Sequence, residues 1–175
     1  MKKNTIQKLT FAAVIAALYA VITLLLSWLS FGPIQFRIAE ALTVLPYFSP
    51  VAIAGLSIGC LISNLIASPY AWLDILFGTA ATVLGAVGTY LLSRKKNRIT
   101  FWLAPLPTVL ANTIIVGAMI TASMSLSGQL SETGFTLTLL YNMATVGLGE
   151  VVCCYALGIP LMFIIKKYRK SLPFS

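Results

Sequence analysis

The sequence consists largely of apolar stretches about twenty residues long, and its basic residues are confined to a few short segments beside them. A helical apolar stretch of this length spans a hydrocarbon core of about 30 Å. Only 9% of the 175 residues are charged and the mean hydropathy is +0.95, whereas soluble proteins carry about 25% charged residues. We therefore expect one all-α integral membrane domain covering residues 1–175.

The basic residues indicate how the chain crosses the membrane. Apart from Arg37 they lie in three clusters, at residues 2–8, 94–98 and 166–170. Basic clusters favour the cytoplasmic side, so an even number of spans should separate neighbouring clusters. Residues 34–68 are too long for one span, and Pro46 and Pro50 divide them because proline disfavours helix continuation. The sequence thus predicts a six-transmembrane-helix bundle in the cell membrane with both termini cytoplasmic. Its expected spans are about 9–29, 35–48, 51–67, 74–93, 101–122 and 137–165.

The residue types that are missing exclude several kinds of chemistry. The chain has no histidine, which removes histidine-based acid–base catalysis and the common zinc motifs. Its three cysteines lie in apolar runs without the spacing of metal ligands, and the phosphate-binding loop motif of nucleotide hydrolases does not occur. We expect no catalytic residues, no metal, no nucleic-acid partner and no cofactor bound by this chain.

Polar side chains within the apolar stretches are the candidate binding residues. Ionisable groups at membrane depth are costly and mark functional sites by default. Counted along helices from the basic clusters, most of these side chains fall in the outer half of the bundle. This asymmetry favours an outward-opening pocket, and the hydrogen-bond-accepting carboxylates favour a cationic or donor-rich small molecule. The predicted substrate-binding residues are Arg37, Glu40, Asn64, Trp72, Asp74, Asn112, Asn142 and Glu150.

Other roles stay open for several of these residues. Arg37 and Glu40, three positions apart, would also pair with each other on a helix, and Asp74 would also serve as the N-cap of its own helix. Glu150 has no basic neighbour and is flanked by glycines, which makes it the best single candidate for a ligand contact. Trp72 would either stack on a flat ligand at the outer mouth or anchor the membrane interface. The same two roles are open for Tyr47, Tyr70 and Tyr141.

Two strips of small residues follow the first and third expected spans. Small residues let membrane helices approach each other closely. The strips therefore indicate either packing within the bundle or docking of a separate membrane partner. The residues are Gly55 and Gly59 on the third span and, on the first span, Ala12, Ala16 and Ala20, accompanied by Ala13 and Ala17.

Three segments carry a family resemblance that covers nearly the whole chain. They are Gln35 to Pro46 (QFRIAEALTVLP), Asn64 to Thr82 (NLIASPYAWLDILFGTAAT) and the pair Gly149-Glu150. Together they resemble the QueT-type family, the substrate-binding (S) components of energy-coupling factor (ECF) transporters. One departure is that the segment between Ser68 and Asp74 is not glycine-rich.

The resemblance implies a six-helix S-component fold that takes up a queuosine precursor, either an aminomethyl-deazaguanine or a queuine-like base. It implies three partners, an ECF membrane coupling protein and two ATPase subunits that use ATP. It also implies that the small residues Ala12, Ala16 and Ala20 dock on the coupling protein. For such a ligand, Glu150 is expected to accept the guanine-like edge, with Glu40 or Asp74 near the amine.

Three alternatives are kept beside this interpretation. The chain could be an S component for another vitamin-like molecule, or a stand-alone proton-coupled carrier with Glu150 or Asp74 as its proton site. Such a carrier needs polar groups on both sides of the midplane and often an internal repeat, and the sequence shows neither. An intramembrane enzyme would have only Cys153 and Cys154 as conceivable nucleophiles.

Overall fold

The protein is all-helical in the part that the structure describes. The computed structural model describes residues 3–30, 35–69, 72–95, 97–129 and 134–168, and every regular element in these ranges is a helix. Four helical segments in them are long and apolar enough to cross a membrane: Thr5–Leu25, Asp74–Ser93, Leu106–Leu126 and Gly134–Tyr168. Two shorter apolar helices, Ile38–Tyr47 and Val51–Ala67, follow the first of these segments.

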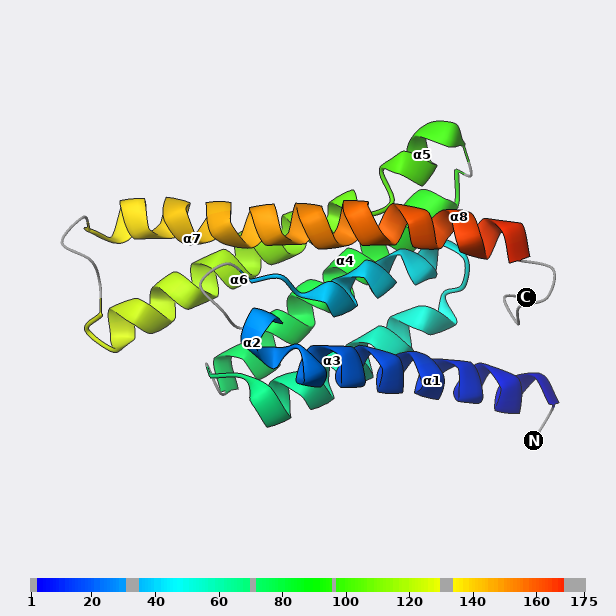
Figure 1. Ribbon diagram of the computed structural model, residues 1–175, viewed down its shortest axis with the longest axis horizontal. Coiled ribbons are helices and arrows are strands. Elements are labelled where there is room, and N and C mark those ends of the chain that lie inside the picture. Colours follow the sequence, from blue (N-terminus) through cyan, green and yellow to red (C-terminus); the bar gives the residue numbers. More distant parts are fainter. Residues whose placement is uncertain (1–2, 31–34, 70–71, 96, 130–133, 169–175) are drawn as a thin grey trace.

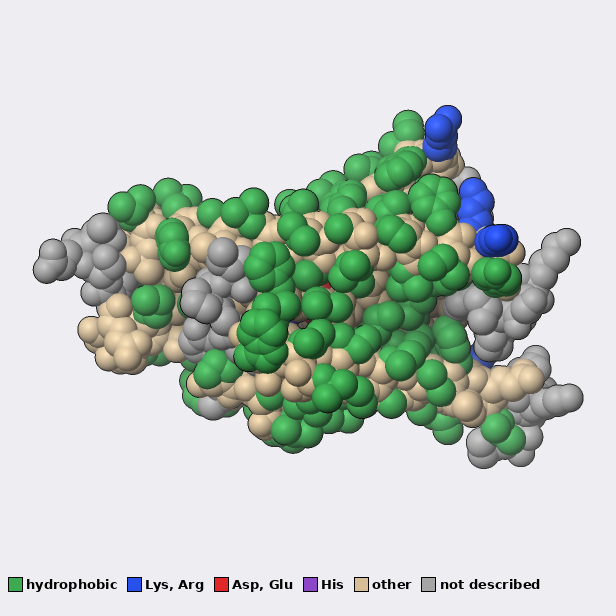
Figure 2. Space-filling view, in the orientation of Figure 1, with side chains coloured by type: hydrophobic (Ala, Val, Ile, Leu, Met, Phe, Trp, Pro, Cys, Tyr) green, Lys and Arg blue, Asp and Glu red, His purple; other side chains and the backbone are tan. Residues whose placement is uncertain are grey.

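The helices form a bundle in which successive long elements run in opposite directions (Figure 1). Helix α1 starts and helix α8 ends at the same end of the bundle, and α5 lies there as well. Figure 2 shows blue Lys and Arg side chains gathered at this end, hereafter the basic end. The elements are α1 (Lys3–Leu25), α2 (Ser27–Ser30), η1 (Ile38–Tyr47), α3 (Val51–Ala67), η2 (Asp74–Gly78), α4 (Thr79–Ser93), α5 (Arg98–Trp102), α6 (Leu106–Leu126), α7 (Gly134–Val151), η3 (Val152–Leu157) and α8 (Gly158–Tyr168).

Two apolar clusters hold the bundle together. The larger one joins α1, η1, α3 and α8, and includes the fully buried side chains of Val44, Leu56 and Met162. The smaller one joins α6 and α7 through Val116 and Val146. Because lipid is as apolar as these side chains, close packing contributes most of the stabilisation between the helices.

The segment expected to be the second span is a 3₁₀ helix, η1, with Pro46 inside it. Ten residues at about 2.0 Å each give a length of about 20 Å, which is shorter than a hydrocarbon core of about 30 Å. Most of its side chains are buried, so η1 is an inner element enclosed by other helices. The buried residues are Ala39, Glu40, Ala41, Thr43, Val44, Leu45 and Pro46.

The fifth expected span, 101–122, begins later in the structure than the sequence predicts. Residues Arg98–Trp102 form a separate short helix, α5, whose N-terminus is closed by a capping box between Asn97 and Thr100. Helix α6 then starts at Leu106, directly after Pro105. Proline lacks the N–H that helix continuation needs, which explains the break between the two helices.

The alanine strip of α1, Ala12, Ala16 and Ala20, is buried and faces the inside of the bundle, so its docking on a partner stays a prediction. A Cβ added at Gly55 would lie 2.6 Å from the Ala12 carbonyl oxygen, and one at Gly59 would lie 2.7 Å from that of Ala16. These two glycines therefore let α3 pack directly on α1. Ala13 and Ala17 lie on the exposed side of α1.

Candidate functional site

Three polar side chains that are far apart in the sequence lie together inside the bundle. Glu40 comes from η1, Asn112 from α6 and Glu150 from α7, and their exposed fractions are 0%, 0% and 1%. The Asn112 amide lies next to both carboxylates. We call Glu40, Asn112 and Glu150 the carboxylate cluster. Burying such groups is costly unless their hydrogen-bonding capacity is used, so their convergence requires an explanation.

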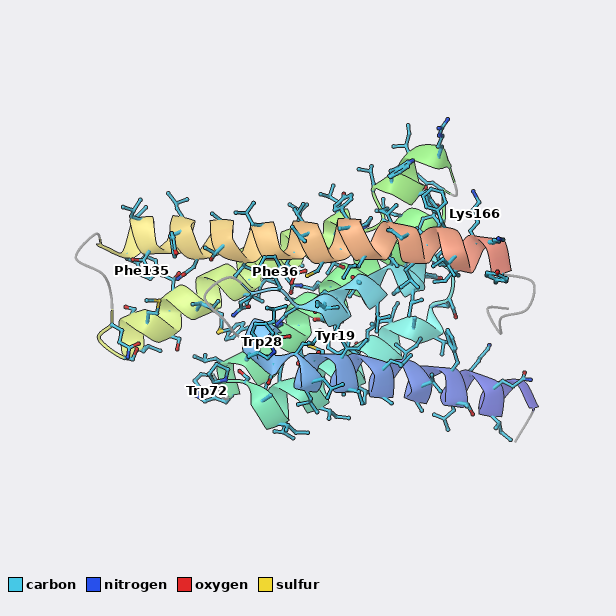
Figure 3. All side chains as sticks on the ribbon, viewed as in Figure 1. Tyr19, Trp28, Phe36, Trp72, Phe135 and Lys166 are labelled. Atoms are coloured by element: carbon cyan, nitrogen blue, oxygen red, sulfur yellow. The ribbon has the colours of Figure 1, made fainter. Side chains whose placement is uncertain are left out.

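One of the two oxygens of the Glu40 carboxylate is hydrogen-bonded by other side chains of the protein. Its Oε1 accepts hydrogen bonds from the Tyr19 hydroxyl at 2.5 Å and from the Thr82 hydroxyl at 2.9 Å. Tyr19 projects from α1 into the interior beside η1 (Figure 3). The second oxygen, Oε2, is buried and has no hydrogen-bond partner among the described residues. One oxygen therefore fixes the carboxylate and the other is available to a ligand.

Asn112 is fully buried beside the two carboxylates, and neither atom of its amide makes a hydrogen bond of ordinary distance and angle in the described part of the chain. An unsatisfied buried polar group costs about 1–3 kcal/mol. The amide offers both a donor and an acceptor, so together with Glu40 Oε2 it presents a set of polar atoms that the edge of a polar ligand would satisfy.

Glu150 stands at the point where α7 changes into the π-helical segment η3. Such segments occur frequently at functional sites because they change the direction of the side chains around them. The Cys154 sulfur lies 3.4 Å from Glu150 Oε2 and 3.6 Å from the Glu40 carbonyl oxygen. This thiol therefore links α7 to η1.

Gly149 allows the start of the η1 segment to lie directly on α7. A Cβ at this position would collide with the carbonyl oxygen of Gln35. The missing side chain therefore brings the chain before η1 against the residue that precedes Glu150. This contact explains why residues more than one hundred positions apart, Glu40 and Glu150, share one site.

A second polar group, hereafter the clamp, lies next to the cluster and joins η1, α3 and η2. Arg37 Nη2 donates to both oxygens of Asp74 at 3.2 Å, and the two side chains are 2% and 0% exposed. Asn64 Nδ2 donates to the Asp74 backbone carbonyl at 3.0 Å, and Ser68 Oγ donates to Asp74 Oδ2 at 2.7 Å. Both carboxylate oxygens of Asp74 thus accept hydrogen bonds from protein donors, which gives it a structural role.

The clamp settles two of the alternatives that the sequence left open. Arg37 and Glu40 do not merely pair with each other, because Arg37 binds Asp74 and Glu40 binds Tyr19 and Thr82. Asp74 is not the N-cap of its helix, because Leu73 occupies that position. Since Arg37 neutralises Asp74, Glu40 and Glu150 are the carboxylates left to face a ligand.

The remaining predicted residues lie elsewhere. Asn142 Nδ2 donates to the Thr121 hydroxyl at 2.9 Å and so joins α7 to α6. Trp72 is 64% exposed and lies towards the end of the bundle opposite the basic end (Figure 3). Tyr141 is also 64% exposed, and Tyr47 lies at the basic end beside Thr100. Tyr70 falls outside the described residues.

Sequence reasoning missed the side chains that hold the cluster in place. Tyr19 and Thr82 donate to Glu40, and Cys154 contacts Glu150. A tyrosine in the middle of a largely apolar span was a usable signal, because its hydroxyl needs a partner when buried. Cys154 follows Glu150 by four positions, the spacing that places two side chains on one helix face.

Comparison with known proteins places the chain in a family. Residues 9–167 match the family model described as QueT transporter. The chain is 33% identical to the queuosine precursor transporter QueT of Lactococcus lactis subsp. cremoris (strain MG1363), over 100% of this chain and 99% of that protein. No solved structure gives a significant match.

Proposed function

This chain belongs to the QueT transporter family, and from that premise we propose that it is the substrate-binding membrane subunit of an ECF-type importer for a queuosine precursor. The observation that carries the proposal is the carboxylate cluster, where two buried acids and an unpartnered amide converge from three elements. Such a set matches a small molecule with several donors and a positive charge. The relative from Lactococcus is named for the same class of substrate.

An aminomethyl-deazaguanine fits the cluster by its chemistry. Its ring N–H and exocyclic amine are adjacent donors that the Glu150 carboxylate would accept together. Its aminomethyl cation would pair with Glu40 Oε2, the oxygen that the protein leaves without a partner. Asn112 would bond the remaining donor and acceptor of the ring. Asp74, being saturated by Arg37 and Ser68, stays out of the contact set.

Replacing Asn112→Leu tests whether the amide belongs to the binding site. We expect the affinity for the aminomethyl-deazaguanine to fall about tenfold, because one or two hydrogen bonds to the ring are lost. The melting temperature of the unliganded variant should stay the same or rise, since a buried amide without protein partners is removed. Calorimetric titration of the purified protein measures the first quantity, and thermal unfolding measures the second.

Asn142→Leu is the matched control, because this buried amide on α7 bonds Thr121 and lies outside the carboxylate cluster. It should lower the melting temperature and leave the affinity within about twofold of the wild type. Wild-type affinity in Asn112→Leu, or equal losses of affinity in both variants, would remove the amide from the binding site.

We further propose that ligand enters from the outer side and that release needs a partner. In this scheme both termini are cytoplasmic and the chain crosses the membrane six times, with η1 as a short buried pass and α3 as a short pass that has one exposed face. The bundle reorients on a coupling protein, and two ATPases supply the energy. Docking then falls on the exposed face of α1, where Ala13 and Ala17 lie between Val14, Leu18 and Val21.

A pair of neighbouring alanines tests this docking face. Ala17→Leu adds bulk on the exposed side of α1 and should leave ligand binding intact while lowering ATP-dependent uptake roughly tenfold or more. Ala16→Leu adds the same bulk on the buried side, where Gly59 packs against it, and should lower stability by about 1–3 kcal/mol. Uptake of labelled base into proteoliposomes that contain the coupling complex measures transport. Normal uptake by Ala17→Leu would place docking elsewhere.

A further inference from the structure

A cavity of about 490 Å³ opens at the basic end of the bundle, and no residue of the carboxylate cluster lines it. It is lined from η1 by Tyr47, from α5 by Arg98, Phe101 and Trp102, and from α8 by Phe163 and Lys166. Figure 3 shows Lys166 on α8 near the short helix α5. Its size falls within the range of about 300–1,000 Å³ for small-molecule sites. We call it the aromatic cavity.

The apolar walls of this cavity are rings that already pack on one another. The ring centroids of Phe101 and Phe163 lie 5.1 Å apart, those of Trp102 and Phe163 5.9 Å, and those of Tyr47 and Phe101 5.9 Å. Tyr47 is oriented further by its hydroxyl, which lies 3.2 Å from the Thr100 hydroxyl. The apolar wall of the cavity is therefore a continuous set of rings in contact with one another.

The charged side chains that line the aromatic cavity are both basic. Arg98 and Lys166 line it, and the Lys166 ammonium lies 5.3 Å from the centroid of the Phe101 ring. None of the three acids that the structure describes lines it, because Glu40, Asp74 and Glu150 are buried in the two polar groups at the other site. The two cations are thus available to an anion that also carries apolar surface.

We infer that the aromatic cavity binds an anionic phospholipid of the cytoplasmic leaflet, with the headgroup phosphate between Arg98 and Lys166 and the upper acyl chains against Phe101, Trp102 and Phe163. Basic ends of membrane helices favour the cytoplasmic side, whose anionic lipids attract such residues. Indole rings prefer this same interface. Because η1, α5 and α8 all line the cavity, a bound lipid would stabilise the packing of η1, the element that carries Glu40, against α5 and α8.

Quenching of Trp102 fluorescence by a brominated lipid tests the site. The chain has three tryptophans, and replacing Trp28→Phe and Trp72→Phe leaves Trp102 as the only reporter. Brominated phosphatidylglycerol added to the detergent-solubilised protein should quench Trp102 and reach saturation. Removing both charges, Arg98→Gln with Lys166→Gln, should raise the midpoint about 25-fold, since each charge near the surface contributes about fivefold.

The matched control removes two charges at the same end but outside the cavity, Lys95→Gln with Lys167→Gln. It should shift the midpoint by less than about twofold and leave the melting temperature near that of the Arg98 and Lys166 variant. Equal shifts in the two double variants would mean general attraction between charges and would overturn the proposal. Equal quenching by brominated phosphatidylcholine, or relief of quenching by inorganic phosphate, would also overturn it, the latter in favour of a soluble phosphate compound.

Discussion

Glu150→Gln should weaken binding of an aminomethyl-deazaguanine about 100-fold. The carboxylate accepts two adjacent donors of the ring, whereas an amide offers one acceptor and turns a donor towards the ligand. A hydrogen bond to a charged group contributes about 1.5–3 kcal/mol, and the substitution affects two of them. Equilibrium titration of the purified protein with the labelled base measures the effect.

The unliganded Glu150→Gln protein should be as stable as the wild type or more stable, because a buried charge is removed. Normal melting combined with weak binding would therefore identify loss of a ligand contact and not loss of the fold. Glu132→Gln removes the same charge from a segment outside the described residues and should bind normally. Wild-type affinity in Glu150→Gln would remove this residue from the contact set.

Arg37→Met should produce the largest loss of stability. The substitution leaves the Asp74 carboxylate buried at 0% exposure without its cation. Breaking a buried ion pair in this way costs about 3–5 kcal/mol, which corresponds to a fall of roughly 10 °C in melting temperature for a chain of this size. Thermal unfolding in detergent, followed by circular dichroism, measures the shift.

A double variant separates the ion pair from the packing of the arginine side chain. Arg37→Met combined with Asp74→Asn has no buried charge at the clamp and should recover part of the lost stability. Arg94→Met, at an exposed position near the basic end, should change the stability by about 0.5 kcal/mol or less. If Arg37→Met melts like the wild type, the clamp does not hold η1, α3 and η2 together.

Much of the fold was predictable because hydropathy and charge report directly on membrane crossing. The 20-residue run from Asp74 to Ser93 appears at its predicted place, and the described parts of the basic clusters in α5 and α8 lie at one end. The 3₁₀ form of η1 was not predictable, since Pro46 marks a break but does not specify the geometry before it. The break before α6 was readable from Pro105 and Pro107, whose rings end one helix and start the next.

The residues of the site could be predicted from the sequence, but the contacts between them could not. Costly polar groups within apolar spans identified Glu40, Asn112 and Glu150, which the structure brings together. Arg37 pairs with Asp74 because η2 lies close to the start of η1. No residue spacing in the sequence indicates this approach. The alanine strip is ambiguous for a related reason: small residues indicate close approach, but only the facing glycines of α3 show which neighbour approaches within this chain.

Mass spectrometry of the small molecule that copurifies with the protein tests the central claim most directly, that the carboxylate cluster captures a queuosine precursor. Wild-type protein, purified from cells that make or are fed the precursor, should release a deazaguanine in near-stoichiometric amount. A folded Glu40→Gln/Glu150→Gln variant prepared in parallel should release none. Recovery of the same molecule from both proteins, or of an unrelated molecule from the wild type, would contradict the assignment of this site.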